Sequence, residues 1–365
     1  MGILSYPMLI LFSLIPVCIS LLALHGMLAG RKRSHGDHHS KAESQPRVLV
    51  MMPCKGEDIK FDETLQAVKN QDYPNYKMVA IVDSYTDAAC EALARHGIET
   101  LISDEKLLTS TDCSGKNRAL ITALALNSKD FGAYVVIDSD TTVGKNWLKD
   151  LVTPLVLTES VGLSTTFPLF YPLDGFWSRV KTVWGLVGSS MQNSRRTIFP
   201  WGGSMAFKQK LLPAAIMELS RSTADDIALG KACKELGMEV ISVPEARPIV
   251  YVKETFSTFS EWSVRQTALS ILGNSSIFKY GMVYYSAFCI NDLILLYLLY
   301  LHSTISALFA LPILLNIIGF CLATGMYSPI YYIIVAFMPF VYAANLIAGR
   351  HIKHITWRGA GYKLH

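Results

Sequence analysis

Two pairs of aspartates are the residues best suited to do chemistry in this chain. Asp138 and Asp140 directly follow the apolar run AYVVI, and Asp225 and Asp226 open a helical pattern. Like charges this close repel, and each raises the pKa of the other unless a cation offsets them. Taken alone, the first pair fits a solvated turn, a divalent-metal site of carboxylate oxygens, or a site for a charged substrate. Neither aspartate of that pair is expected to matter much to folding by itself.

The second pair and two nearby cations each have two interpretations. Asp225 and Asp226 could interact with a helix dipole, or Asp226 could act as a general base toward a hydroxyl. Arg265 could bind phosphate through two parallel hydrogen bonds, or could be solvated on its helix. Lys116, near the start of a helical segment, could contact phosphate or be exposed. Which interpretation holds for each residue depends on where the helices and strands place its side chain.

Short apolar segments alternate with helical segments in the middle of the chain. Strands are predicted at 47–53, 77–83 and 133–138, and helices at 61–71, 86–97 and 115–128. This alternation predicts an α/β fold with right-handed crossovers and a mostly parallel, Rossmann-like sheet flanked by helices. Such sheets bind ligands at the carboxyl ends of their strands. Asp83, Asp138 and Asp140 stand at such ends.

The apolar composition, 51% hydrophobic residues, indicates membrane helices at both ends of the chain. Residues 3–29 carry no charged side chain and are long enough to cross a hydrocarbon core of about 30 Å. The RKR at 31–33 follows this run, so the residues after it should be cytoplasmic. Between Lys279 and Arg350 the only charged residue is Asp292, which leaves room for two long or three short spans.

The basic tail should also be cytoplasmic, which favours two C-terminal crossings over three. Residues 167–197 mix aromatic and basic side chains and could lie at the membrane interface or pack as a domain helix. The expected organisation is a transmembrane anchor (1–30), a linker (31–46), a cytoplasmic domain (47–278), a C-terminal transmembrane region (279–349) and a basic tail (350–365).

Several other functions find little support in the sequence. The seven cysteines show no paired spacing typical of zinc, and the net charge of +4 comes without a long basic tract, so no nucleic-acid partner is expected. No GxGxxG or P-loop glycine pattern follows the first strand. His35, His38 and His39 in the linker could bind a metal, but are better read as solvated.

The first half of the domain resembles family-2 glycosyltransferases. MMPCKGEDIKFDETLQAVKNQDYPNYKMVAIVD (51–83) matches the opening of that family, with NQDYP its most specific part. The resemblance continues through GKNRAL, VVIDSDTTV, WGGSMAFKQKLL and TADDIALGKACKELG. The tail ITWRGAGYKL (355–364) resembles the ceramide glucosyltransferase-like subfamily.

The resemblance implies a GT-A fold and roles for particular residues. Asp138 and Asp140 would bind Mg²⁺ or Mn²⁺, and Asp226 would be the catalytic base, with Asp225 in the position of the family's glutamate. The remaining roles would be donor binding by Asp83, Lys116, Asp138 and Arg265, and acceptor-side contacts by Trp201, Gly202, Gly203 and Trp262. Two motifs depart from the family: QxxRW reads WSVRQ, and the nucleotide loop reads VDSYTD.

The expected activity is therefore that of a membrane-bound inverting hexosyltransferase. Its donor would be a nucleotide-sugar, expected to be a UDP-sugar that carries a glucose-like hexose. Its acceptor would be the hydroxyl group of a membrane lipid, and the protein would be embedded in the lipid bilayer. The alternatives are a polyprenyl-phosphate glycosyltransferase, a polysaccharide synthase and, least favoured, a non-catalytic scaffold of the same fold.

Overall fold

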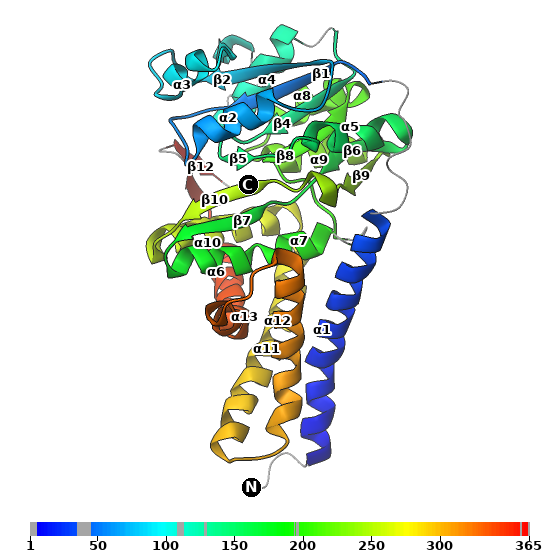
Figure 1. Cartoon of the computed structure of the whole chain (residues 1–365), viewed down its shortest axis with the longest axis vertical. Coiled ribbons are helices and arrows are strands. Elements are labelled where there is room, and N and C mark those ends of the chain that lie inside the picture. Colours follow the sequence, from blue (N-terminus) through cyan, green and yellow to red (C-terminus); the bar gives the residue numbers. More distant parts are fainter. Residues whose placement is uncertain are drawn as a thin grey trace.

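The structure is a computed structural model of the chain, which describes residues 6–34, 45–107, 113–127, 130–192, 194, 197–357 and 360–363. An α/β domain forms one end of the molecule, and a stem of long helices extends from it (Figure 1). The linker predicted at 31–46, with its three histidines, lies mostly outside the described residues.

The main sheet of the domain has seven strands within the described residues, in the order β3-β2-β1-β4-β8-β6-β9. Among the described strands of this sheet, only β8 runs antiparallel to its neighbours, so the sheet is mostly parallel, as predicted. The bounds are β1 Val48–Pro53, β2 Tyr76–Val82, β3 Glu99–Ile102, β4 Ala133–Ile137, β6 Val161–Thr165, β8 Ser204–Lys208 and β9 Glu239–Ser242.

Helices cover both faces of this sheet because its central strands are apolar on both sides. Val48, Val50 and Met52 of β1 pack in one core, and Leu49 and Met51 pack in the core of the opposite face. The flanking elements are α2 Phe61–Lys69, α3 Ala89–Arg95, η1 Glu105–Leu107, α4 Gly115–Asn127, α5 Trp147–Leu157, η3 Gln209–Leu211, α8 Leu212–Leu219, α9 Asp225–Glu235 and η4 Pro244–Ala246.

A smaller sheet and three helices lie between the main sheet and the stem (Figure 1). The strands are β5 Thr141–Thr142, β10 Ile249–Lys253 and β7 Leu169–Asp174, and the helices are α6 Phe176–Trp184, α7 Leu186–Gln192 and α10 Phe256–Gly273. The aromatic and basic segment 167–197 supplies β7, α6 and α7. Helix α6 contacts β7, β10 and α10 of the domain as well as α13 of the C-terminal region, so this segment joins the two parts.

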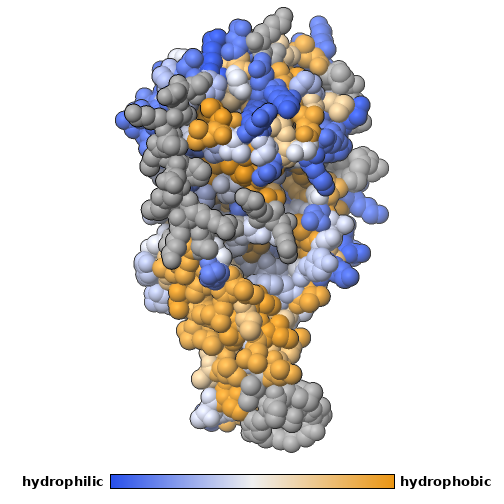
Figure 2. All heavy atoms as spheres, turned by 90° about the vertical axis from the view of Figure 1, so that its right-hand side faces the viewer, coloured by the Kyte–Doolittle hydropathy of each residue, from blue (hydrophilic) through white to orange (hydrophobic). Residues whose placement is uncertain are grey.

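Four of the described helices are long and apolar enough to cross a membrane, which marks the chain as an integral membrane protein. They are α1 Tyr6–Ser34, α11 Ser276–Tyr300, α12 Ser306–Thr324 and α13 Pro329–His351. Three are C-terminal, whereas the charge pattern of the sequence favoured two and left room for three. Apolar side chains dominate the surface of the stem (Figure 2).

Helix α13 differs from the other three in its direction. Helices α1, α11 and α12 extend away from the domain side by side and contact one another, whereas α13 is seen almost along its axis beneath α6 (Figure 1). The hairpin of β11 His354–Trp357 and β12 Ala360–Lys363 then lies beside the domain. Two C-terminal helices therefore run the length of the stem, and the third packs against the domain.

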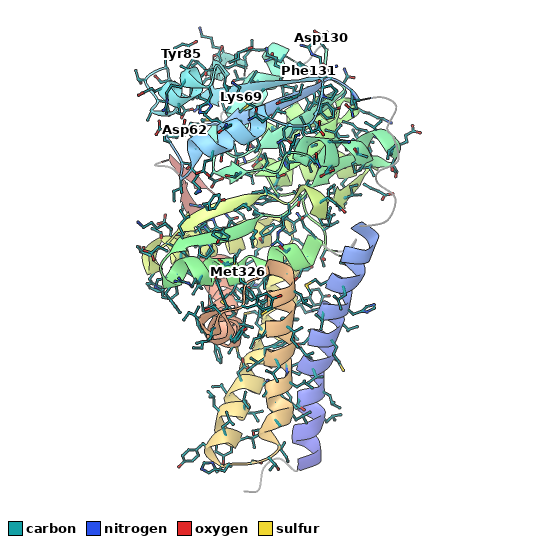
Figure 3. The ribbon with its side chains drawn as sticks, viewed as in Figure 1. Asp62, Lys69, Tyr85, Asp130, Phe131 and Met326 are labelled. Carbon is teal, nitrogen blue, oxygen red and sulfur yellow. The ribbon has the colours of Figure 1, made fainter. Side chains whose placement is uncertain are left out.

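An apolar junction fixes α12 and α13 to the domain. Val180 and Val183 of α6 pack with residues of α10, α12 and α13, among them Met326 at the turn between the last two helices (Figure 3). The Tyr342 hydroxyl on α13 donates to the backbone oxygens of Val183 at 3.2 Å and Trp184 at 3.0 Å. The domain is thus held at a fixed position relative to the stem.

Candidate active site

A cavity of about 1770 Å³ opens at the carboxyl ends of β1, β2 and β4 and continues between the helices of the stem. Every site residue predicted from the sequence lines it: Asp83, Lys116, Asp138, Asp140, Trp201, Gly202, Gly203, Asp225, Asp226, Trp262 and Arg265. The structure therefore brings together side chains from β2, α4, α9, α10 and the turns after β4 and before β8.

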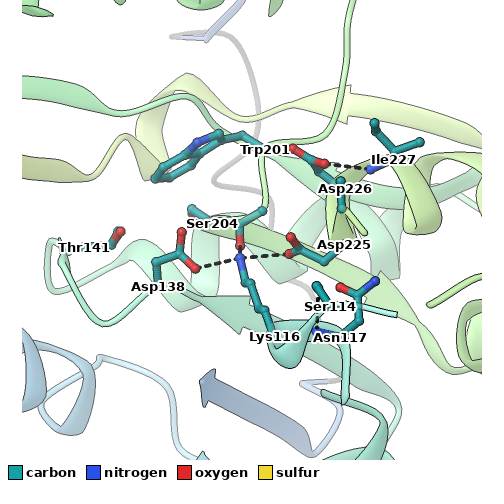
Figure 4. A network of polar contacts seen from close by, with 12 residues as sticks. Ser114, Lys116, Asn117, Asp138, Thr141, Trp201, Ser204, Asp225, Asp226 and Ile227 are labelled. Atoms are coloured by element: carbon teal, nitrogen blue, oxygen red, sulfur yellow. Dashed lines mark hydrogen bonds and ion pairs between the residues drawn. The ribbon is translucent and has the colours of Figure 1, made fainter. Parts of the chain in front are cut away.

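Lys116 is the centre of a buried charge network (Figure 4). Its Nζ lies 2.6 Å from Asp138 Oδ1, 3.0 Å from Asp225 Oδ2 and 3.2 Å from the Gly202 oxygen. Burial lowers the pKa of Lys116, but the two carboxylates outweigh burial and raise it above its ordinary value. The lysine is therefore charged and offsets the repulsion between the two acidic motifs. Its side chain is only 8% exposed, so the reading of Lys116 as an exposed residue is wrong.

Asp225 and Asp226 occupy the first turn of α9 but differ in environment. Asp225 is buried, and burial raises the pKa of its carboxyl, against the opposite effect of Lys116. Burial and the neighbouring charge of Asp225 raise the pKa of Asp226 to about 7. The Asp226 Oδ1 atom accepts a hydrogen bond of 2.8 Å from the Ile227 amide. A carboxyl group with this pKa can both take and release a proton near neutral pH.

The residues of the Asp138–Asp140 turn fit a divalent metal. The Asp138 amide donates to the Gly203 oxygen at 3.2 Å, the Thr141 hydroxyl donates to Asp140 Oδ1 at 3.2 Å, and both aspartates line the cavity. In the described part of the chain, no three or more His, Cys, Asp or Glu side chains are grouped so that they alone could hold a metal ion. Mg²⁺ commonly uses one or two carboxylates together with phosphate oxygens of a substrate, and this turn offers that arrangement.

Asp83 follows β2 and lines the same cavity. Its Oδ2 lies 3.5 Å from Lys55 Nζ and its Oδ1 lies 3.4 Å from Arg118 Nη2, while Arg118 also pairs with Glu105. The side chain of Asp83 is 40% exposed, so these surface pairs are weak. The carboxylate therefore remains accessible to a hydrogen-bond donor from a ligand in the cavity.

A buried ion pair beside the site was missed by sequence reasoning. Lys181 of α6 lies 2.6 Å from Glu254 Oε1, and its Nζ lies 4.1 Å from the centre of the Trp262 ring. Burial lowers the pKa of Lys181, against the effect of Glu254. Only the mixture of aromatic and basic residues at 167–197 signals this part of the site, and that pattern fits a membrane interface and a packed domain helix equally well. No sequence pattern near Glu254 identifies it as the partner of Lys181, because α6 and the end of β10 come together only in the folded chain.

Gly202 allows the close approach of Asp225. A Cβ at Gly202 would lie 2.5 Å from Asp225 Oδ2 and 2.7 Å from Oδ1, so Gly202→Ala must displace a carboxylate held by Lys116. We expect this variant to lower the free energy of unfolding by about 1–3 kcal/mol, the usual effect of overpacking. Gly144→Ala, whose Cβ would meet no atom within 4 Å, is the matched control in thermal unfolding. Equal stability of the two variants would contradict the expected clash.

The family model described as glycosyl transferase family 21 matches residues 8–365. The chain belongs to this family. It is therefore a glycosyltransferase that uses a nucleotide-sugar donor. No curated protein matches the chain.

Solved structures agree with this assignment at the level of the fold. The glycosyltransferase is similar to a mannosyltransferase from Pyrobaculum calidifontis in complex with GDP-mannose and Mn²⁺, with 18% identity, a TM-score of 0.56, and coverage of 93% of this chain and 97% of that chain. Glucosyl-3-phosphoglycerate synthase from Mycobacterium tuberculosis, in complex with Mn²⁺ and UDP-glucose, has 17% identity and a TM-score of 0.44, and the match covers 64% of this chain and 80% of that chain. The predicted GT-A-type fold is confirmed.

Proposed function

We propose that this glycosyltransferase transfers a glucose-like hexose from a UDP-sugar to the hydroxyl of a membrane lipid, with inversion at the anomeric carbon. One observation carries the proposal: the cavity that holds the acidic residues is also lined by residues of the membrane helices α1, α11, α12 and α13. A soluble acceptor would not need a binding site that extends into the stem.

The polar half of the cavity suits the donor. Asp138 and Asp140 would hold Mg²⁺ or Mn²⁺, which would supply positive charge to the donor diphosphate and its leaving group. Asp83, at the end of β2, can accept hydrogen bonds from the nucleoside, and Arg265 lines the cavity from α10 and can contact phosphate. Lys116 would keep Asp138 and Asp225 in place while the donor binds, through the ion pairs described above.

Asp226 is the base that the geometry favours. Its carboxyl group lines the cavity and has a pKa of about 7, so a large fraction is ionised at neutral pH. It would take the proton from the acceptor hydroxyl as the oxygen attacks the anomeric carbon in one displacement, without a covalent intermediate. Asp225, held by Lys116, would orient this first turn of α9 and keep the pKa of Asp226 high.

The stem half of the cavity suits an uncharged acceptor. The cavity-lining residues of α1, α11, α12 and α13 within the described part of the chain include no charged side chain; examples are Leu24, Tyr284, Phe288, Leu315 and Met338. Apolar and aromatic walls fit acyl chains, and a ceramide or glycerolipid hydroxyl is the preferred acceptor, as the resemblance of the tail to the ceramide glucosyltransferase-like subfamily suggests. A polyprenyl-phosphate acceptor, the main alternative, would bring a phosphate group, for which these four helices offer no cationic side chain among their described cavity-lining residues.

The domain is proposed to face the cytoplasm. The RKR at 31–33 belongs to the end of α1 on the domain side of the stem, and the basic tail also returns to that side because α13 lies against the domain. Positive residues flanking membrane helices are typical of the cytoplasmic side. Accessibility of a cysteine label placed at Lys353 in right-side-out and inverted vesicles would test this orientation.

The activity can be tested directly with the purified protein. Radiolabelled UDP-glucose, UDP-galactose and GDP-mannose would each be incubated with total membrane lipid extract, and lipid-extractable label would be measured. We expect label from a UDP-sugar in a neutral glycolipid. Label in an acid-labile anionic lipid would instead support the polyprenyl-phosphate alternative, and no label in lipid or polymer from any donor would favour a non-catalytic scaffold.

The raised pKa of Asp226 predicts the pH dependence of the reaction. A base must be ionised, so kcat/KM should rise with pH through a midpoint near 7 and should be lost as the carboxyl is protonated at lower pH. The raised pKa affects stability in the opposite direction. The folded state binds the proton of Asp226 more tightly than the unfolded state does, so the contribution of Asp226 to the free energy of unfolding falls as the pH rises from about 4 to 7. A pH–rate profile with an acid limb near pH 4 would contradict this role of Asp226.

A further inference from the structure

Ser139, the middle residue of the Asp138–Asp140 turn, is held by a side chain from a distant part of the chain. Its hydroxyl donates a hydrogen bond of 2.6 Å to Asp58 Oδ2, across 81 residues of sequence. Ser139 is 3% exposed, whereas Asp138 and Asp140 on either side of it are half-buried and line the cavity. The protein therefore fixes the residue between the two carboxylates.

A second contact joins the end of this turn to the same region of the chain. Thr142 of β5 and Thr64 of α2 share a hydrogen bond of 3.0 Å between their hydroxyl groups. Within the turn, the Thr141 amide donates to the Asp138 oxygen at 3.1 Å. The residues that follow β1 thus contact the turn at two points, one on either side of Asp140.

The loop between β1 and α2, which carries Asp58, is itself anchored at both ends. Near its start, the Gly56 amide donates to Asp87 Oδ1 at 2.8 Å. At its end, Lys60 has a φ of 60°, a left-handed conformation that is uncommon for a residue with a side chain, and its Nζ lies 4.3 Å from the centre of the Tyr251 ring. Such conformations persist only where the surrounding structure fixes them. The loop therefore presents Asp58 from a defined position.

We propose that Asp58 is a positioning residue that acts through the Ser139 hydroxyl to set the direction in which the Asp138–Asp140 turn presents its carboxylates. The inference rests on the metal site of the proposed function. Asp58 does not line the cavity, so it acts on the turn and not on the substrate. A hydrogen bond at the middle residue restricts rotation of the peptide groups on both sides, and these groups carry the two metal-binding residues. Loss of a group that orients metal ligands typically costs about 10–100-fold in metal affinity.

The test measures Mn²⁺ binding directly, so it does not depend on activity. Purified protein would be titrated with Mn²⁺ in the presence of saturating UDP, and free Mn²⁺ would be followed by its electron paramagnetic resonance signal. The variants are Asp58→Ala, Asp58→Asn, Ser139→Ala and the double alanine variant. Asp62→Ala is the matched control, because it removes an exposed carboxylate near the start of α2 that pairs with Arg95 at 3.3 Å. Thermal unfolding of each variant would check folding.

We expect Asp58→Ala and Ser139→Ala each to weaken Mn²⁺ binding about tenfold, and the double variant to be no weaker than either. Asp58→Asn should stay within about threefold of the wild type, because its amide oxygen can still accept the hydrogen bond from the serine. Asp62→Ala should bind Mn²⁺ as the wild type does. A variant that is merely less stable would lower the unfolding temperature without this pattern of affinities.

Two results would overturn the positioning role and leave the proposed reaction standing. One is a Mn²⁺ affinity in Asp58→Ala equal to that in Asp62→Ala, and the other is a double variant in which the two single losses multiply. If the expected pattern appears but no donor labels a lipid, the positioning role holds and the proposed reaction fails. A wild-type protein that binds no Mn²⁺ with UDP present would overturn the positioning role together with the metal site.

Discussion

Replacing Asp226 by asparagine should lower kcat about 10²–10⁴-fold, the usual contribution of a general base. The amide cannot accept the hydroxyl proton, but its oxygen can still accept the hydrogen bond from the Ile227 amide, so the first turn of α9 should remain intact. Donor and acceptor KM should therefore stay close to wild type. The measurement is steady-state transfer of labelled sugar into lipid, with thermal unfolding as the check on folding.

The same variant discriminates between the acceptor classes. A phosphate acceptor is already ionised and needs no strong base, so a variant that keeps kcat within about threefold of wild type would point to a polyprenyl phosphate. The acid limb of the pH–rate profile gives a second criterion, because it should disappear from whatever residual activity Asp226→Asn retains. Persistence of that limb would assign it to another group.

Replacing either Asp138 or Asp140 by alanine should lower transfer by at least about 100-fold, since charge stabilisation by a bound metal is worth several kcal/mol. Wild-type activity should require Mn²⁺ or Mg²⁺ and should be lost in EDTA. Full lipid labelling in EDTA would contradict the metal assignment for this pair.

Asp138→Ala should also lower stability. Asp138 is paired with the buried Lys116 at 2.6 Å, so this variant leaves that lysine with Asp225 alone. We expect it to lose about 1–3 kcal/mol of folding free energy. The sequence suggested that neither aspartate of the pair matters much to folding by itself. An unfolding midpoint equal to that of the wild type would show that the Lys116 pair is energetically minor.

The part of the site at strand ends could be predicted because its signals are local. Apolar runs such as 133–137 define β4, and residues that follow such a run in a parallel sheet must lie at its binding edge. Asp83 and Asp138 needed no further information. The family motifs added Asp226 and Arg265, and the structure places both in the cavity that Asp83 and Asp138 line.

The rest of the site depends on contacts between segments far apart in the chain. Lys181 meets Glu254 across 73 residues, and Trp184 meets Tyr342 across 158 residues. The pattern of apolar residues in these segments does not indicate which distant residue each one contacts. Hydropathy also could not separate α13 from α11 and α12, because all three are long and apolar. What distinguishes α13 is that it packs against α6 and α10 of the domain as well as against α11. The number of apolar segments is therefore easier to predict than how each one runs.

The attachment of the domain to the stem through α12 and α13 changes how the substrate concentration should be expressed. With the cavity opening held at a fixed height, a lipid acceptor of the kind proposed would arrive by lateral diffusion within one leaflet, and the encounter would be two-dimensional. The rate would then follow the surface density of the acceptor among the surrounding lipids. Dilution of the acceptor with inert phospholipid would slow the enzyme even when the amount of acceptor per volume of sample is constant.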